Sequence, residues 1–239
     1  MDPLLTMLVW TTAAGSCVLV GGVLARFAHI RPQWLETEFR HSVIAFGGGV
    51  LVSAVALVLV PQGSQMLVSP LWTCLLFIAG GGAFCLLEVI LHRRGGEKPQ
   101  FSAMLLDYLP ESVALGGLFA AGSEAAPLLA LMIGLQNLPE GFNAYRELTV
   151  HRPKSSRRTL YLMAAVIPLG PLSGFGGWVW GADRPLLLGG IMLFAAGGIL
   201  YLLFQDIAPQ ARLARKWAPT LGAVLGFTLG LLGSLLLHP

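Results

Sequence analysis

Two short polar runs interrupt stretches of the chain that are otherwise apolar enough to lie inside a membrane. Residues 136–141 read QNLPEG, and residues 107–112 read DYLPES, which repeats the Leu-Pro-Glu core. A carboxylate at membrane depth is costly and usually functional. Proline has no N–H group, so each run also leaves a backbone carbonyl without its helical partner. The repeated pattern predicts that the two runs bind something together.

Spacing places each polar pair on one helix face. Asp107 and Glu111 are four residues apart, as are Gln136 and Glu140, and side chains at this spacing lie one above the other on a helix. Carboxylates held close together in a low-dielectric interior repel, so either some are protonated or a cation sits among them. Four oxygen-bearing side chains fit a divalent cation. The alternative is that they hydrogen-bond to each other and only hold helices together.

The composition is that of an integral membrane protein. Of the 239 residues, 55% are hydrophobic and only 11% are charged, against about 25% charged in soluble domains. The net charge of +3 does not indicate a nucleic-acid partner, because the basic residues are confined to short links. Cys17, Cys74 and Cys85 lie in apolar runs without metal-ligand spacing, which predicts small apolar side chains rather than a disulfide or a metal site.

Eight segments are long and apolar enough to cross a lipid bilayer, which takes about 20 residues. They are predicted at residues 4–25, 42–60, 70–91, 101–122, 126–146, 160–181, 186–208 and 217–237. Because the links between them are short, residues 1–239 are expected to form one all-α membrane domain.

Charge predicts the orientation of these segments. All but one of the 15 Lys and Arg residues fall in alternate links, and the exception is Arg184. The basic links are residues 26–41, 92–100, 146–159 and 209–216. By the positive-inside rule these links are cytoplasmic and both termini are outside.

This orientation puts the two polar pairs at one depth. Both are about 10–15 Å from the cytoplasmic ends of their helices, at about 1.5 Å per residue. The short link at residues 123–125 makes the fourth and fifth spans neighbours. Their polar faces are therefore expected to converge.

With these motifs in its fourth and fifth spans, the chain resembles the ZIP (Zrt-/Irt-like) family of divalent metal transporters. That family has eight spans, external termini, and His-Asn-x-Pro-Glu-Gly motifs in helices 4 and 5. Weaker similarities follow in the right order along the chain. They are the glycine-rich residues 45–49 ahead of 59–61 (LVP), residues 168–170 (PLG), and residues 195–198 (AAGG) ahead of 204–209 (FQDIAP).

The resemblance implies a set of metal ligands, with the metal ion as the transported substrate and no cofactor. They are Asp107, Glu111, Gln136, Asn137, Glu140 and Asp206. Glu111 and Glu140 match the motif glutamates, and Asp206 matches an acidic exit position near the end of helix 7. The family also leads us to expect a plasma-membrane location, such as a bacterial inner membrane, and a homodimer.

Several positions depart from the family pattern. Tyr108 stands where helix 4 has Asn, Ile167 replaces a Glu, and Val50 aligns with a ligand in some members. Asp107 stands where helix 4 usually has His. We therefore expect one metal held by oxygen ligands, a set that selects zinc over manganese or iron only weakly. The same departures fit a second hypothesis, a homologue that keeps the fold but acts as a metal sensor or structural partner.

The first hypothesis is a transporter that moves zinc, iron, manganese or a similar ion toward the cytoplasm by alternating access. The sequence has no phosphate-binding Gly-x4-Gly-Lys-Ser/Thr loop and no Ser-His or His-Glu-x-x-His arrangement, so neither ATP-driven transport nor an enzyme is predicted. Glu88 is expected to pair with Arg93 or reach the cytoplasmic surface. Asn143 either lines the path beside Glu140 or hydrogen-bonds across to another helix, and we prefer the second interpretation.

Overall fold

The computed structural model describes residues 2–28, 33–93, 100–150, 156–181, 183–213 and 217–237. Within those ranges the chain is helical, with short turns between helices and no strand. Seven helical segments there are long and apolar enough to cross a membrane. By helix length and composition, the chain is an all-α, multi-pass membrane protein.

Five of the eight predicted spans are uninterrupted helices close to their predicted bounds. They are α1 (Pro3–Phe27), α4 (Pro70–Arg93), α5 (Gln100–Ala120), α6 (Ala125–Val150) and α11 (Ala218–Leu237). The start of α1 shows why the chain turns helical there: the Asp2 carboxylate accepts a hydrogen bond of 3.1 Å from the Leu4 N–H, and Pro3 occupies the first turn.

Helix α6 is the one predicted span that is not among the seven apolar segments. Its 26 residues are long enough, at about 39 Å, to cross a bilayer. Polar residues such as Gln136, Glu140 and Arg146 lower its hydropathy. The helix tolerates them because it is enclosed by α1, α2, α5, α7 and α11. A helix surrounded by protein does not need an apolar surface all round.

Two of the predicted spans are longer than expected because their helices continue through proline. The span predicted at 42–60 consists of α2 (Gln33–Ala54), the π-helical turn η1 (Val55–Leu59) and α3 (Val60–Leu67). The span predicted at 186–208 consists of α9 (Pro185–Leu202), the π-helical turn η3 (Leu203–Ile207) and α10 (Ala208–Ala211).

Both π-helical turns end two residues before a proline. Pro61 follows η1 and Pro209 follows η3. Proline cannot donate to the carbonyl four residues earlier, and a widened turn brings in a donor from one residue further along. The sequence motifs Leu-Val-Pro and Ile-Ala-Pro therefore widen a continuing helix instead of ending it.

The span predicted at 160–181 is broken into α7 (Ser156–Val166) and α8 (Leu169–Gly181). The break falls at Ile167 and Pro168, where the Ile167 N–H donates to the Ala164 carbonyl at 3.2 Å in a tightened turn. Pro168 has no N–H with which to continue the α-helical ladder. The prediction of a single helix was therefore wrong here.

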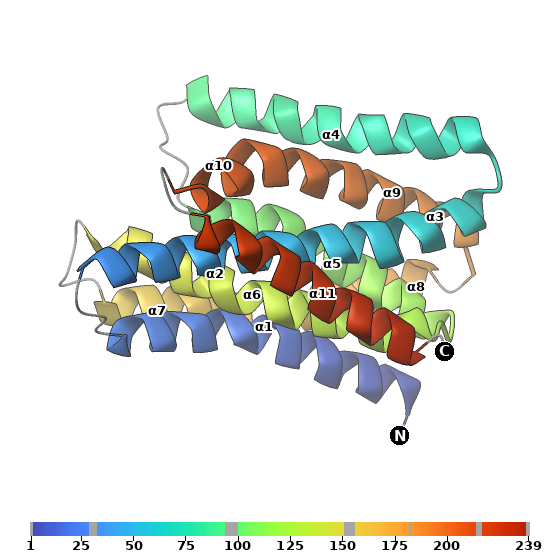
Figure 1. The fold of residues 1–239 in the computed structure, drawn as a ribbon. Helices are drawn as coiled ribbons and strands as arrows, with labels where there is room; N and C mark the ends of the chain where they lie inside the picture. Colours follow the sequence, from blue (N-terminus) through green and yellow to red (C-terminus); the bar gives the residue numbers. More distant parts are fainter. Residues whose placement is uncertain are drawn as a thin grey trace.

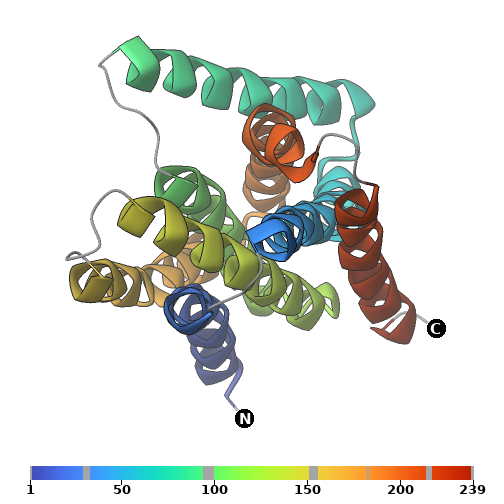
Figure 2. The same ribbon diagram turned by 60° about the vertical axis from the view of Figure 1, so that its left-hand side comes forward.

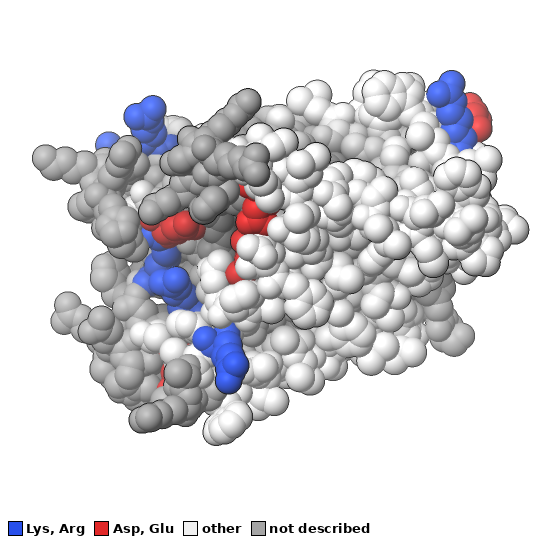
Figure 3. Space-filling view, turned by 90° about the horizontal axis from the view of Figure 1, so that it is seen from above, with Lys and Arg blue, Asp and Glu red and all other residues white. Residues whose placement is uncertain are grey.

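Successive segments cross the molecule in alternate directions (Figure 1). Helices α1, α4, α6 and α10 end, and α2, α5, α7 and α11 begin, at one end of the molecule, whereas α1 begins and α11 ends at the other. Lys, Arg, Asp and Glu side chains gather mainly at the first end of the face seen in Figure 3, with one further group at the opposite end. Several Lys and Arg residues of the basic links fall outside the described ranges: Arg31, Arg94, Lys98, Arg152, Lys154, Arg215 and Lys216.

The helices form two groups. Helices α1, α5, α6, α7 and α8 pack mainly on each other, and α2 with α3, α4, α9 and α11 form the second group. Figure 2 shows α4 at the far edge of the second group and α1 at the opposite edge of the first. The groups meet chiefly where α2 packs on α6 and α5 packs on α9.

Glycine permits the closest helix approaches in each group. A Cβ on Gly116 of α5 would overlap the Gly174 carbonyl of α8, and one on Gly177 of α8 would overlap the Val113 carbonyl. In the second group, a Cβ on Gly197 of α9 would overlap the Phe77 carbonyl of α4. Close backbone contact of this kind is a main source of helix association in lipid.

Candidate functional site

The predicted polar faces of α5 and α6 meet inside the first helix group. Gln136 Nε2 donates a hydrogen bond of 2.5 Å to Glu111 Oε2. The two helices are joined by a short turn and run in opposite directions. With Glu111 beside Gln136, Asp107 and Glu140 therefore lie one turn further along, at a common level toward the basic links.

The three carboxyl groups are buried and influence one another. Asp107 is 3% exposed, Glu111 0% and Glu140 7%. Each of the two glutamates interacts electrostatically with Asp107, and Glu140 also does so with Glu111. Such a group is unfavourable as three free carboxylates, so protons or a cation must offset the repulsion.

Most oxygens of the cluster have no protein donor. Those without a hydrogen-bond partner among the described residues are Asp107 Oδ1, Glu111 Oε1, Gln136 Oε1, Asn137 Oδ1, Asn143 Oδ1 and both Oε atoms of Glu140. Buried polar atoms are almost always satisfied in native proteins. Here all the unsatisfied atoms are acceptors, and a cation or a proton is what such a set can hold.

The side-chain amide of Asn137 already uses its nitrogen in a hydrogen bond to another helix. Its Nδ2 donates a hydrogen bond of 2.9 Å to the Ala14 carbonyl of α1. The residue is fully buried, and this bond ties α6 to α1. Its Oδ1 remains without a partner among the described residues. Asn137 therefore has a structural role, and any role as a ligand would rest on that oxygen.

Asp206 does not lie on α5 or α6. It lies on η3, which packs on α2. A Cβ on Gly48 of α2 would contact Leu203 and Ile207 of η3, whereas one on the preceding Gly47 would contact Pro139 of α6. Asp206 and the cluster thus belong to elements that meet α2 at neighbouring positions.

Two departures from the ZIP pattern lie together in space. Tyr108 is fully buried, with its hydroxyl 3.5 Å from the Thr11 carbonyl that it donates to. A Cβ on Gly15 would meet both the Tyr108 hydroxyl and the backbone of Ile167 at the α7–α8 break. A Cβ on Gly170 would overlap the same hydroxyl. The Tyr108 hydroxyl thus lies between α1 and the α7–α8 break, close to the second departure, Ile167.

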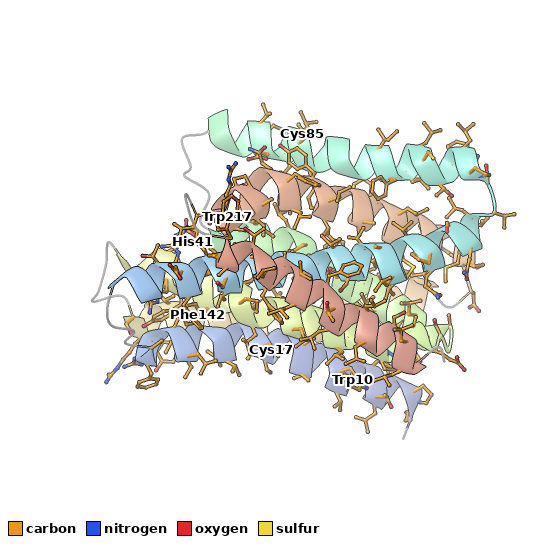
Figure 4. All side chains as sticks on the ribbon, viewed as in Figure 1. Trp10, Cys17, His41, Cys85, Phe142 and Trp217 are labelled. Carbon is orange, nitrogen blue, oxygen red and sulfur yellow. The ribbon has the colours of Figure 1, made fainter. Side chains whose placement is uncertain are left out.

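Among the described residues, His and Cys side chains do not join the carboxylates in a metal-binding group. His41 Nδ1 lies 2.7 Å from the Thr37 carbonyl oxygen of its own helix, and Cys17 Sγ donates to the Ala13 carbonyl at 3.5 Å. Cys17 and Cys85 lie on α1 and α4, at opposite sides of the bundle (Figure 4). No three His, Cys, Asp or Glu side chains of the described residues form a ready-made metal cage. A cation here would need amide oxygens as well as carboxylates.

Glu88 holds two helices together. Its Oε2 accepts a hydrogen bond of 2.6 Å from the Tyr201 hydroxyl, and its Oε1 accepts one of 3.5 Å from Gln205 Nε2. Both donors come from the α9–η3 segment, so Glu88 ties α4 to it. The side chain of Arg93, its predicted partner, lies outside the described residues.

Asn143 is a candidate for which the sequence left two interpretations open. It is 3% exposed, and its Oδ1 has no partner among the described residues. A cross-helix hydrogen bond, the preferred interpretation, does not use that oxygen among the described residues. The signal was its spacing, since Asn143 lies three residues after Glu140 and seven after Gln136, on the same helix face.

No protein-family model and no curated protein matches this chain. The resemblance to ZIP transporters therefore remains a prediction, which rests on the residues of α5 and α6 and their surroundings.

Proposed function

We propose that the chain is a ZIP-like transporter that carries divalent cations such as zinc, iron or manganese toward the cytoplasm. The observation behind this proposal is the buried group of acceptor oxygens between α5 and α6, most of which have no donor among the described residues. The ion binds Asp107, Glu111, Gln136 and Glu140 as cargo, between two helix groups that move relative to each other.

Helix association alone does not account for this arrangement. Side chains that only hold helices together in lipid satisfy each other's hydrogen bonds. Across the α5–α6 seam, Gln136 and Glu111 make such a bond. The second Glu111 oxygen and both Glu140 oxygens are left without partners among the described residues. Leaving buried acceptors unsatisfied costs free energy, which a bound cation would offset.

Transport also needs a moving boundary, and the packing offers one. The site belongs to the group formed by α1, α5, α6, α7 and α8, which meets the other group along α2–α6 and α5–α9. In the proposed cycle the site-bearing group slides against the other, which exposes the cation first outside and then to the cytoplasm. The basic links mark the cytoplasmic side in a plasma membrane, by the positive-inside rule.

Uptake into proteoliposomes tests the proposal. Purified protein is assayed with Mn²⁺, Fe²⁺, Zn²⁺ and Cd²⁺, alongside Glu140→Gln and Glu111→Gln. We expect flux of at least one ion in the parent protein and background flux in both variants, because each loses an anionic ligand. Glu124→Gln is the matched control, since Glu124 is exposed in the turn between α5 and α6. Unchanged flux in Glu140→Gln at equal protein abundance would refute the proposal.

A second candidate is a ZIP-like protein that binds metal without transporting it. Tyr108 favours it, because this residue stands where the resemblance implies Asn and its phenol packs at the α7–α8 break. Equilibrium dialysis separates the two candidates. Cation binding that Glu140→Gln abolishes, with no flux for any ion, would indicate a sensor or structural partner.

A further inference from the structure

We propose that Asn143 is an additional cation ligand, which receives the ion from the Asp107–Glu140 level on its way toward the basic links. This inference rests on the proposed function and extends its site by one helical turn. It also narrows the substrate class to cations that accept an all-oxygen ligand set, of which Mn²⁺ is the probe used below.

The first argument is the helix face on which Asn143 lies. At about 100° per residue, Gln136, Glu140 and Asn143 fall within about 60° of arc around α6. Gln136 bonds Glu111, so this arc faces α5. Asn143 therefore continues the row of polar side chains that begins at Gln136.

The neighbouring faces of α6 are taken by other helices. Toward α1, Asn137 bonds the Ala14 carbonyl, and Gly141 packs so closely that a Cβ would overlap the Val18 carbonyl. These contacts leave only the arc between α1 and α2 for the polar row.

Helix α2 closes the opposite side. Pro139 packs on Gly47, and the ring of Phe142 meets that of Phe39 edge-on with centroids 6.1 Å apart. The row of Gln136, Glu140 and Asn143 is thus bounded by α1 and α2 and closed by α5.

The second argument is the unsatisfied amide oxygen. Asn143 is 3% exposed and its Oδ1 has no hydrogen-bond partner among the described residues. An asparagine that served only to join helices would use that oxygen. Burying it unpaired costs free energy in the absence of a ligand, and a cation one turn beyond Glu140 would satisfy it.

The chemistry of the ligand suits a release step. An amide oxygen is neutral, so it holds a divalent cation less tightly than a carboxylate does. Oxygen ligands without imidazole or thiolate suit hard cations such as Mn²⁺. Asn143 is closer to the basic links than Asp107 and Glu140 are, so the ion meets a weaker ligand as it leaves.

The test compares Asn143→Leu and Asn143→Asp with the parent protein in detergent. Leucine keeps the volume and removes the unpaired oxygen, and aspartate keeps an oxygen. We expect Asn143→Leu to melt higher than the parent without metal, yet to lose most of the Mn²⁺-induced rise in melting temperature. Its Mn²⁺ affinity by equilibrium dialysis should fall roughly tenfold, as for the loss of one contact to a charged group. Asn143→Asp should keep both the rise and the affinity.

A purely structural role would give the opposite pattern. Asn143→Leu would then melt lower without metal and keep the full Mn²⁺-induced rise, which would overturn the inference. Ser53→Ala is the control, because Ser53 is buried and its hydroxyl donates to the Val50 carbonyl of its own helix, at 2.6 Å.

The failure of this inference is distinct from failure of the proposed function. If Glu140→Gln abolishes Mn²⁺ binding and uptake while Asn143→Leu leaves both unchanged, the transport site stands and Asn143 is not part of it. If the parent protein neither binds nor transports any of the four ions, the proposed function itself is wrong, and the inference with it.

Discussion

The cluster between α5 and α6 differs from ordinary buried polar groups in lacking donors. Among the described residues, Gln136 and Glu111 make a hydrogen bond across the α5–α6 seam, and most of the remaining oxygens are acceptors without a partner. Proteins tolerate such local cost where a ligand offsets it. The hydroxyl of the neighbouring Tyr108 is tightly packed, because it fits only where Gly15 and Gly170 have no side chain. An oxygen cluster with unsatisfied hydrogen-bond acceptors therefore lies next in sequence to a tightly packed Tyr108.

The Tyr108 pocket gives a prediction at the residue scale. Gly15→Ala should destabilise the protein by about 1–3 kcal/mol, because the added methyl group overlaps the Tyr108 hydroxyl. In a Tyr108→Phe background the same change should cost less than about 1 kcal/mol, since the overlapping atom is gone. Thermal unfolding in detergent measures both. An equal cost in the two backgrounds would mean that another contact of Gly15 limits the space.

At the scale of secondary-structure elements, proline has three different effects on helix continuity. Pro110 and Pro139 lie inside uninterrupted helices, Pro61 and Pro209 follow π-helical turns, and Pro168 breaks a helix in two. In every case the ring removes one backbone donor. Packing around the freed carbonyl then determines whether the helix continues, widens or stops.

Glycine spacing on α8 gives a prediction at this scale. Gly177→Ala should destabilise the α5–α8 pair by about 1–3 kcal/mol, because its Cβ would overlap the Val113 carbonyl and backbone cannot move aside easily. Gly176→Ala is the matched control one residue earlier, where a Cβ meets nothing within 4 Å. It should be neutral or stabilising by up to about 1 kcal/mol, from helix propensity. Equal melting temperatures for the two variants would contradict this account of the contact.

For the whole molecule, the main feature is the enclosure of α6 between the two helix groups. Helix α1 covers it from one group and α2 from the other, so its polar side chains are kept from lipid. Charged side chains gather mainly at one end of the molecule in the view of Figure 3, and both chain ends lie at the other end in Figure 1. This asymmetry is what the positive-inside rule uses to orient a membrane protein.

Orientation is therefore the prediction at the scale of the molecule. In a background with Cys17, Cys74 and Cys85 replaced by Ala, Asp183→Cys should react with a membrane-impermeant maleimide in intact cells. Arg212→Cys should react only after lysis. Both positions are exposed, one before α9 and the other after α10, so reactivity reports the side of the membrane. The reverse pattern would mean that the basic links face outward and that the proposed direction of transport is wrong.

Much of the site was accessible from the sequence because it depends on local spacing. Helical periodicity places Asp107 with Glu111 and Gln136 with Glu140, and a short turn makes their helices neighbours. The contact between Gln136 and Glu111 follows from that geometry. The packing of η3, which carries Asp206, on α2 could not be predicted from local spacing, because α2 is far away in the sequence.

The sequence by itself determined the membrane class and the approximate position of each span, since length and hydropathy are local properties of a helix in lipid. It also determined which pairs of polar residues share a face. Only the tertiary structure decided which prolines interrupt a helix, that Gln136 and Glu140 of α6 are buried, and that Asn143 Oδ1 finds no partner among the described residues. The physical reason is that each of these outcomes depends on atoms supplied by distant segments, whose positions no local pattern records.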